Sequence, residues 1–247
     1  MTLDPSITRS FSEDGYGVLE QAIPEAALEA LDTSCQAYLE EHIGLMAQVQ
    51  ADVLGLTHKD RRYFLPSWHD PSSEVGRFLF GDLMAEVVGR FLGPEAYLFL
   101  ELFIVKSGRI GMPFGWHQDS GYLLGQAHEP YLSLWCALDD ATEENGALHV
   151  LPWSQGGPRE ILPHRKDKAS GDLIGYEGDT PGTVVPVARG GIVAMSSTLF
   201  HRSGPNTTDH PRRAFLVSYS AHPILNPQGG LWNRAVPFLQ RGVRVTA

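Results

Sequence analysis

Apolar residues recur at helical intervals in two segments of the N-terminal third of the chain. The first is PEAALEALDTSCQAYLEEHIGLMAQVQADV, residues 24–53, where Pro24 suits the first helical turn and Glu25 suits the positive end of the helix dipole. The second begins at the serine pair of SSEVGRFLF and closes at Gly93, a residue suited to a C-cap. These patterns predict a mostly helical part over residues 1–94, with a short strand, GYGVLEQAI, ahead of the first helix.

The pattern changes at residue 95, where short runs rich in Val, Leu, Phe and Tyr alternate with Gly, Pro, Asn and Asp. Many short strands separated by turn residues indicate a sandwich or a barrel. Because the helical patterns come first and no segment repeats, we expect one domain over residues 1–247, with helices packed outside a β-barrel of residues 95–247. The predicted strands are AYLFLELFIVK, YLSLWCALDD, GALHVLP, GTVVPVARGGIVAMSS and RRAFLVSYSAH.

One segment within the predicted barrel, residues 154–182, is polar, charged and rich in Gly and Pro. Long loops without regular structure in a compact domain are usually lids, binding loops or disordered insertions. We therefore expect residues 154–182 to form a mobile loop or a lid, and a floppy surface insertion is an equal alternative.

Composition narrows the classes of partner. Hydrophobic residues make up 43% of the chain and charged residues 19%, as in ordinary soluble proteins with a real core. The formal charge of −10 argues against a nucleic acid or an anionic membrane as partner, so an anionic substrate would need a local basic group. The two cysteines, Cys35 and Cys136, form no metal or redox motif and are expected as reduced thiols. With no apolar signal region and no run of about 20 apolar residues, a cytoplasmic location is expected.

The stretch GWHQDSGY places an imidazole, His117, and a carboxylate, Asp119, two residues apart at the edge of the predicted sheet. Positions i and i+2 of an extended strand point the same way, so both groups can converge on one metal ion. His201, which follows another strand-like run, offers a third ligand. Two histidines and one carboxylate are the ligand set of non-haem Fe(II) oxygenases, whereas zinc more often takes a fuller nitrogen or sulfur set.

Each of these residues has a simpler structural alternative. His117 and Asp119 could be a hydrogen-bonded pair that fixes a turn, and His201 alone would more often be a structural histidine. A second His-x-Asp, HKD at residues 58–60, lies in a charged stretch ahead of the barrel, and we interpret it as a solvated loop.

An anion site is predicted close to His201. Ser203 lies two residues further along the same predicted strand, and Arg212 begins the returning strand after a Gly-Pro-Asn turn. A hydroxyl and a guanidinium together can grip a carboxylate, as a chelating keto acid would require. Arg213 competes for this role, but adjacent strand residues face opposite sides, so only one of the two can enter the barrel. Ser203 could instead cap the turn.

With these residues in place the chain resembles the phytanoyl-CoA dioxygenase (PhyH) family of Fe(II)/2-oxoglutarate-dependent oxygenases. The resemblance rests on the motif HQD, on SLWCALDDATEENGALHVLPWS and on HRSGPNTTDHPRR, and it extends to the opening FSEDGYGVLEQAIPEAALEAL. It implies a mainly β fold with flanking helices, whose core is a double-stranded β-helix (jelly-roll, cupin-like). It also implies iron held by His117, Asp119 and His201, and 2-oxoglutarate held by Arg212 and Ser203 in a pocket lined by Trp135.

The resemblance further implies chemistry in which O2 and 2-oxoglutarate give succinate and CO2 while a substrate C–H bond is oxidised. Halogenating relatives replace the carboxylate ligand with Gly or Ala, so Asp119 favours hydroxylation. Desaturation, cyclisation or epimerisation with the same cofactors is the nearest alternative, and a metal-binding jelly-roll that oxidises nothing is a remoter one.

Two departures from the family pattern limit what is carried over. Many relatives have Pro-Gly-Ser-His after the turn, where this chain has Pro152-Trp153-Ser154-Gln155. No basic cluster is evident for the phosphates of CoA. The expected partner is therefore a small-molecule substrate, either free or attached to a carrier or CoA, with no nucleic acid and no membrane.

Overall fold

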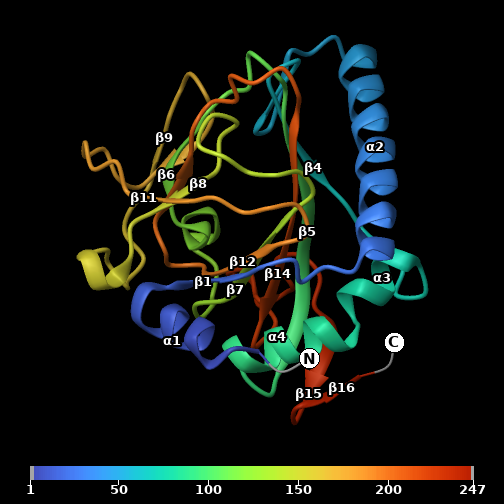
Figure 1. The fold of residues 1–247 in the computed structure, drawn as a ribbon, viewed down its shortest axis with the longest axis vertical. Coiled ribbons are helices and arrows are strands. Elements are labelled where there is room, and N and C mark those ends of the chain that lie inside the picture. Colours follow the sequence, from blue (N-terminus) through green and yellow to red (C-terminus); the bar gives the residue numbers. More distant parts are fainter. Residues whose placement is uncertain (1–2, 246–247) are drawn as a thin grey trace.

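The apolar runs predicted as strands form two facing antiparallel sheets in a computed structural model, which describes residues 3–245 (Figure 1). The larger sheet has the order β1-β12-β7-β14-β5-β4-β3-β2, and the smaller sheet has the order β11-β8-β13-β6. The strands of the larger sheet are β1 (Tyr16–Leu19), β2 (Val53–Leu54), β3 (Thr57–His58), β4 (Arg62–Pro66), β5 (Ala96–Lys106), β7 (Leu132–Ala137), β12 (Ile192–Ser196) and β14 (Arg212–Ser220), with β15 (Val236–Gln240) beside β5 and β16 (Val243–Arg244) beside β15. Those of the smaller sheet are β6 (Phe114–His117), β8 (Leu148–Val150), β11 (Thr183–Val185) and β13 (His201–Ser203).

Both faces of the larger sheet are buried, which explains why its strands are apolar on both sides rather than alternating. On β7, Leu134 and Cys136 pack with the helices, whereas Trp135 and Ala137 point between the two sheets. The fold is therefore mainly β with helices outside, as predicted. Both cysteines are buried free thiols, also as predicted.

Four helices lie in the N-terminal part: α1 (Pro5–Asp14), α2 (Glu25–Gln48), α3 (Glu74–Leu79) and α4 (Asp82–Phe91). Sequence reasoning missed α1, which has only two large apolar residues, Ile7 and Phe11, and buries no residue completely. The prediction of a single helix from the serine pair to Gly93 is wrong, because the helix is interrupted between α3 and α4. At Gly81 the backbone is extended, and a Cβ there would lie 2.5 Å from the Arg77 carbonyl oxygen.

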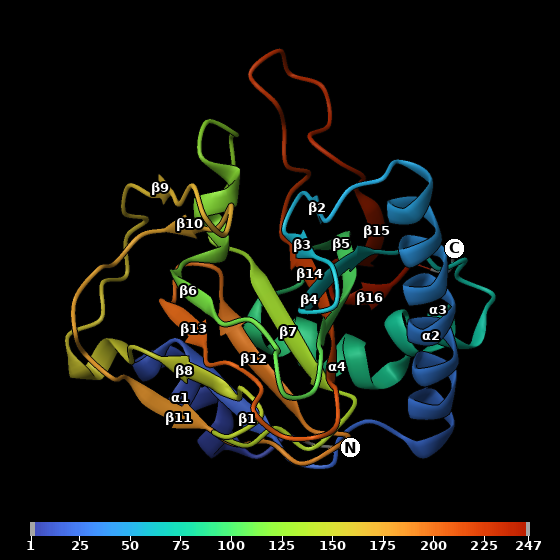
Figure 2. The same ribbon diagram turned by 90° about the horizontal axis from the view of Figure 1, so that it is seen from above.

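The segment of residues 154–182 contains two short strands, β9 (Arg165–Lys166) and β10 (Leu173–Ile174), which pair with each other. Figure 2 shows them beside β6. Gly175 donates a backbone hydrogen bond to Trp116 of β6 at 2.9 Å, and Ile174 lies against Gly115. The segment therefore packs along the strand that carries His117.

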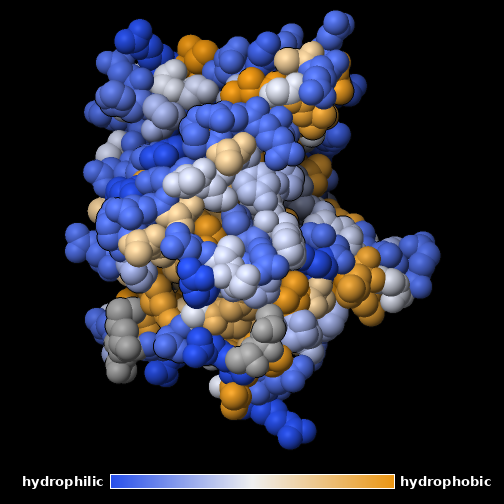
Figure 3. Space-filling view, turned by 90° about the vertical axis from the view of Figure 1, so that its right-hand side faces the viewer, coloured by the Kyte–Doolittle hydropathy of each residue, from blue (hydrophilic) through white to orange (hydrophobic). Residues whose placement is uncertain are grey.

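The face that carries α2 is mostly hydrophilic, with several small groups of hydrophobic residues on it (Figure 3). Some exposed apolar surface is normal on a folded protein. Among residues 3–245, the helices are too short or too polar to cross a bilayer.

Candidate metal centre

Three side chains converge between the two sheets. His117 ends β6, His201 begins β13, and the two residues are cross-strand partners, with ring centroids 4.1 Å apart. Asp119 Oδ1 lies 3.6 Å from Nε2 of each histidine. One ligand atom from each residue lies within 4.8 Å of the others, so the three could hold a single metal ion.

The sequence argument for Asp119 was right about direction and wrong about the element. Asp119 begins a 3-10 helix, η1 (Asp119–Leu123), and is not part of a strand. Gln118 before it is still extended, which turns the carboxylate to the same side as His117.

A hydrogen bond between Nδ1 and a backbone carbonyl oxygen orients each imidazole. Nδ1 of His117 lies 2.9 Å from the Gly115 carbonyl oxygen, and Nδ1 of His201 lies 3.1 Å from the Leu199 carbonyl oxygen. A carbonyl oxygen only accepts, so each Nδ1 carries the proton and each Nε2 presents its lone pair. Both rings are therefore held in the tautomer that a metal ligand needs.

The charge state of the cluster suits a cation. Burial would raise the pKa of Asp119, but His201, His117 and a 2.6 Å hydrogen bond donated by Ser133 outweigh it and lower the pKa to about 2. Burial, followed by the charge of His117, lowers the pKa of His201 to about 4. At neutral pH Asp119 is ionised and His201 is neutral, the forms in which both bind metals.

The predicted anion site lies in the same cavity. Arg212 begins β14 and is 1% exposed, and Ser203 on β13 is also buried. Nη2 of Arg212 donates to the Gly146 carbonyl oxygen at 3.0 Å, but its Nε and Nη1 have no hydrogen-bond partner within residues 3–245. Burial lowers the pKa of Arg212 to about 10, so it stays cationic at pH 7. A buried cation with two free donors is costly unless an anion completes it.

Trp135 and Arg213 lie as the sequence predicted. The Trp135 ring lines the cavity with the Arg212 guanidinium 5.2 Å from its centroid. Arg213 points the other way, to Asp139 and Asp32 on the outer side of the sheet. Trp135, Ser203 and Arg212 thus line the same cavity as the metal cluster, the name used here for the side chains of His117, Asp119 and His201.

A single cavity of about 270 Å³ connects the metal cluster, Arg212 and a largely apolar compartment. Lys106 and Arg62 lie in register with Arg212 on the adjacent strands β5 and β4, so three cationic side chains cross the wall in a row. Burial, with Arg212 next to it, lowers the pKa of Lys106 well below its usual range. Nζ of Lys106 donates to the carbonyl oxygens of Ser203 and Gly204.

Sequence reasoning missed the residues that fix the turn after His117. Gln118 is fully buried, and its side chain bonds residues 154–182 by donating to the Glu160 carbonyl oxygen and accepting from the Leu162 N–H. It also donates to the carbonyl oxygen of Thr198, outside that segment. The Gln118 backbone N–H donates to Nε2 of His164 at 3.0 Å. The one sequence feature that could have pointed to this role of Gln118 is its position as a polar residue between two candidate ligands.

The second His-x-Asp motif is a solvated turn only in part, because Lys59 and Asp60 are exposed turn residues but His58 is not. His58 belongs to β3 and is half-buried, and its Nε2 lies 2.8 Å from the Ser170 carbonyl oxygen. It lies outside the metal cluster and contacts the 154–182 segment instead.

The chain matches several known proteins. Phytanoyl-CoA dioxygenase domain-containing protein 1 from Mus musculus is 29% identical over 67% of this chain and 56% of that protein, and the Bos taurus protein is 28% identical over 94% of this chain and 93% of that protein. A 2-aminoethylphosphonate dioxygenase from an uncultured bacterium is 26% identical over 58% of this chain and 53% of its own length. The chain spans about half the length of the mouse, rat and zebrafish relatives.

Two solved structures share the fold. EvdO2 from Micromonospora carbonacea, complexed with 2-oxoglutarate, is 25% identical with a TM-score of 0.67, covering 100% of this chain and 95% of that chain. The α-ketoglutarate-dependent carbocyclase SnoK is 20% identical with a TM-score of 0.69, covering 95% and 96%, and supports the fold alone.

The model of a protein family, described as phytanoyl-CoA dioxygenase (PhyH), matches residues 11–214 of this chain. This range includes His117, Asp119 and His201, the two residues predicted for the anion site, and Trp135. The family predicted from the sequence is therefore confirmed: the chain belongs to the phytanoyl-CoA dioxygenase family, a family of non-haem iron oxygenases that use 2-oxoglutarate.

Proposed function

We propose that this protein is an Fe(II)- and 2-oxoglutarate-dependent dioxygenase that hydroxylates a small molecule at an unactivated C–H bond. His117, Asp119 and His201 would hold the iron, and Arg212, Ser203 and Trp135 would hold 2-oxoglutarate. The donor set fits iron, because two neutral imidazoles and one carboxylate leave positions open for a chelating cosubstrate and O2.

The observation that carries the proposal is the buried guanidinium of Arg212, whose Nε and Nη1 have no partner within residues 3–245 and which lies in the same cavity as His117, Asp119 and His201. A site that only bound a metal would leave this buried cation uncompensated, at a cost of about 1–3 kcal/mol for each polar group left unpaired. The far carboxylate of 2-oxoglutarate would supply the missing acceptor, while its keto acid end reaches the metal.

Iron and 2-oxoglutarate, when bound, supply the oxidising chemistry, with succinate and CO2 as the cosubstrate's products. The chain's own residues orient the reactants. Ser133 holds Asp119 through its hydrogen bond, and the Gly115 and Leu199 carbonyl oxygens hold the two histidine rings. The apolar wall of the cavity excludes water from the reacting groups.

The strand order supports a jelly-roll core. β5, β14, β7 and β12 are neighbours in the larger sheet, while β6, β13, β8 and β11 are neighbours in the smaller one. Strands β5 to β8 therefore alternate between the two sheets, and so do β11 to β14, while β8 and β11 pair within the smaller sheet, as in a double-stranded β-helix. In this arrangement β6 and β13 meet side by side and bring both histidines together.

The test is turnover in the presence of candidate substrates, read by the mass of the product. Hydroxylation adds the mass of one oxygen atom, desaturation or ring closure removes two hydrogens, and epimerisation leaves the mass unchanged. We expect the added oxygen together with one succinate per product. Products without added oxygen would replace hydroxylation by one of the other outcomes while keeping the cofactors.

A further inference from the structure

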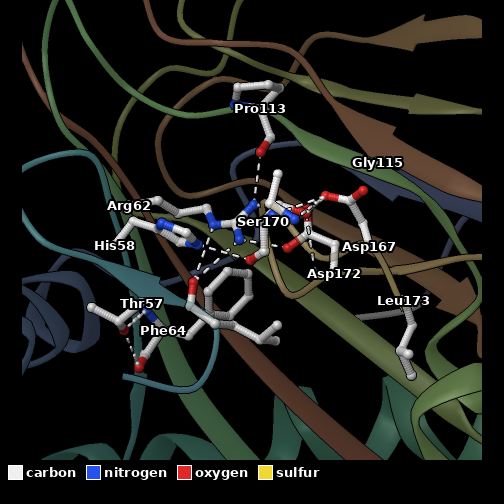
Figure 4. Close-up of polar contacts among 12 residues, drawn as sticks. Thr57, His58, Arg62, Phe64, Pro113, Gly115, Asp167, Ser170, Asp172 and Leu173 are labelled. Carbon is white, nitrogen blue, oxygen red and sulfur yellow. Dashed lines mark hydrogen bonds and ion pairs between the residues drawn. The ribbon is translucent and has the colours of Figure 1, made fainter. Parts of the chain in front are cut away.

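Two buried guanidinium groups on the cavity wall differ in their partners. Arg212 has two nitrogen atoms without a partner within residues 3–245, whereas every nitrogen of Arg62 donates at least one hydrogen bond. Nη1 and Nη2 of Arg62 reach the two carboxylate oxygens of Asp172 at 3.1 and 2.5 Å (Figure 4). The Leu56 and Pro113 carbonyl oxygens accept the remaining bonds.

The Arg62–Asp172 pair is sealed from water, with side chains 0% and 4% exposed. The Arg62 guanidinium also lies over the rings of Phe64 and Phe114, at 5.2 and 4.7 Å from their centroids. A cation with such a set of acceptors has little left to offer a further anion. Although Arg62 lines the cavity, its charge is neutralised by Asp172.

The other cations of the wall are also engaged. Lys106 donates to two backbone carbonyl oxygens, and Arg202 lies over the Trp116 ring and donates to the Pro181 carbonyl oxygen. Arg212 is the one cation of the described cavity lining with buried donors unused, and the proposed function assigns it to 2-oxoglutarate.

Beyond the cosubstrate end, the cavity wall is apolar and largely aromatic. Phe99 packs edge-to-face with Tyr131 at 4.9 Å and with Trp232 at 6.3 Å, and Leu100 and Leu102 lie beside them on the wall. Desolvating a charged group against such a wall is costly without a partner, whereas burying apolar surface is favourable.

We propose that the substrate is an uncharged, largely apolar molecule, bound against Phe64, Phe99, Leu100, Phe114 and Trp232. This inference rests on the proposed function, because it takes Arg212 to be occupied by 2-oxoglutarate. It separates this protein from a relative such as the 2-aminoethylphosphonate dioxygenase, whose named substrate carries an amine and a phosphonate. It also places any charged carrier or CoA portion outside this compartment.

The test uses matched ligands that differ in charge and hardly in shape. Protein loaded anaerobically with Fe(II) and saturating 2-oxoglutarate is titrated with 2-naphthamide and with 2-naphthoate, and then with biphenyl-4-carboxamide and biphenyl-4-carboxylate. Binding is followed by calorimetry. We expect the amides to bind more tightly than the acids by about tenfold or more. Equal or tighter binding of the acids, or failure of both amides to bind, would overturn the proposal.

Variants show whether Asp172 sets this preference. Asp172→Asn leaves Arg62 without its counter-charge, so the affinity for the acids should rise by about tenfold while that for the amides stays unchanged. Asp139→Asn makes the same charge change on the outer side of the sheet, next to Arg213, and should leave both affinities as they were. If the affinity for the acids does not rise in folded Asp172→Asn protein, pairing with Asp172 is not what keeps Arg62 from binding an anionic ligand.

The two proposals fail in different ways. Binding of 2-oxoglutarate is measured in the same samples by the visible absorption of its Fe(II) chelate. If 2-oxoglutarate does not bind, the proposed function fails, and the comparison of amide with acid is then made in Arg212→Met protein, where no free cation remains on the cavity wall. A preference for the acids in that protein would overturn the substrate class on its own.

Discussion

Arg212 and Arg213 are neighbours in sequence with opposite surroundings. The first is buried beside the metal cluster with two unpartnered nitrogens, and the second forms ion pairs with Asp139 and Asp32. Strand alternation alone explains the difference, because successive side chains leave opposite faces of β14. This residue-scale contrast provides a matched pair of variants.

Arg212→Met should weaken 2-oxoglutarate binding roughly 100-fold, because a charge-assisted bidentate contact is worth about 3 kcal/mol. Calorimetry on protein loaded with Mn(II) in place of iron measures this without turnover. Arg213→Met is the control and should bind 2-oxoglutarate like the wild type. Unchanged affinity in folded Arg212→Met protein would show that the anion site lies elsewhere.

His201 makes metal-free protein sensitive to acid. The pKa of His201 is about 4 in the folded protein, against an ordinary value of 6.5. Between these two pH values the unfolded chain therefore binds a proton at His201 and the folded chain does not. The contribution of His201 to the free energy of unfolding is therefore fully present above pH 6.5. It is lost as the pH falls toward 4, by about 3 kcal/mol at most. Urea unfolding of metal-free protein between pH 7 and pH 4 measures the loss.

The control variants for this dependence are His201→Asn and His222→Asn. The first removes the buried titrating group, so its stability should fall less steeply between pH 6.5 and 4. The second changes an exposed histidine and should reproduce the wild-type slope. An equal slope in all three proteins would mean that His201 does not titrate as described.

At the scale of elements, residues 154–182 are joined at several points to residues around the three candidate ligands. Gln118 bonds to Glu160 and Leu162, and Asp172 bonds to Arg62 of β4. The Leu173 N–H donates to the hydroxyl of Tyr122, a residue of the cavity wall. We propose that this segment acts as a lid over the site.

The lid proposal predicts a change in hydrogen exchange. Binding of Mn(II) and 2-oxoglutarate should slow exchange of the Leu162, Leu173 and Gly175 amides, because their acceptors belong to residues at or next to the site. Amides of α2, far along the outer side of the sheet, should be unaffected. Unaltered exchange throughout residues 154–182 would contradict the lid.

Elements with long apolar runs were predictable from the sequence, and those fixed by tertiary contacts were not. β5 was predicted with its observed limits because it is an eleven-residue run made mostly of aliphatic and aromatic residues. The break between α3 and α4 was not, because it depends on the close approach of the backbone at Gly81. The three ligands and Arg212 had sequence spacing to identify them, whereas the Arg62–Asp172 pair joins residues 110 positions apart and has no such signal.

For the whole molecule, the net charge of −10 and the local charge at the site have opposite signs. Arg212 is a buried cation with unused donors inside an acidic protein, so a small dianion such as 2-oxoglutarate is attracted by the site and not by the surface. The fold contributes by pairing β6 with β13, which brings His117 and His201 together from distant parts of the chain, so that they could share one ion with Asp119.

The central claim is that this arrangement oxidises 2-oxoglutarate. The most direct measurement is succinate release from anaerobically iron-loaded protein given 2-oxoglutarate and O2, beside an Asp119→Ala control that lacks the carboxylate ligand. We predict slow release by the wild type without added substrate, and none by the variant. Equal release by both proteins would contradict the ligand assignment. An absence of release together with an absence of the visible Fe(II)–2-oxoglutarate band in the wild type would contradict the function itself.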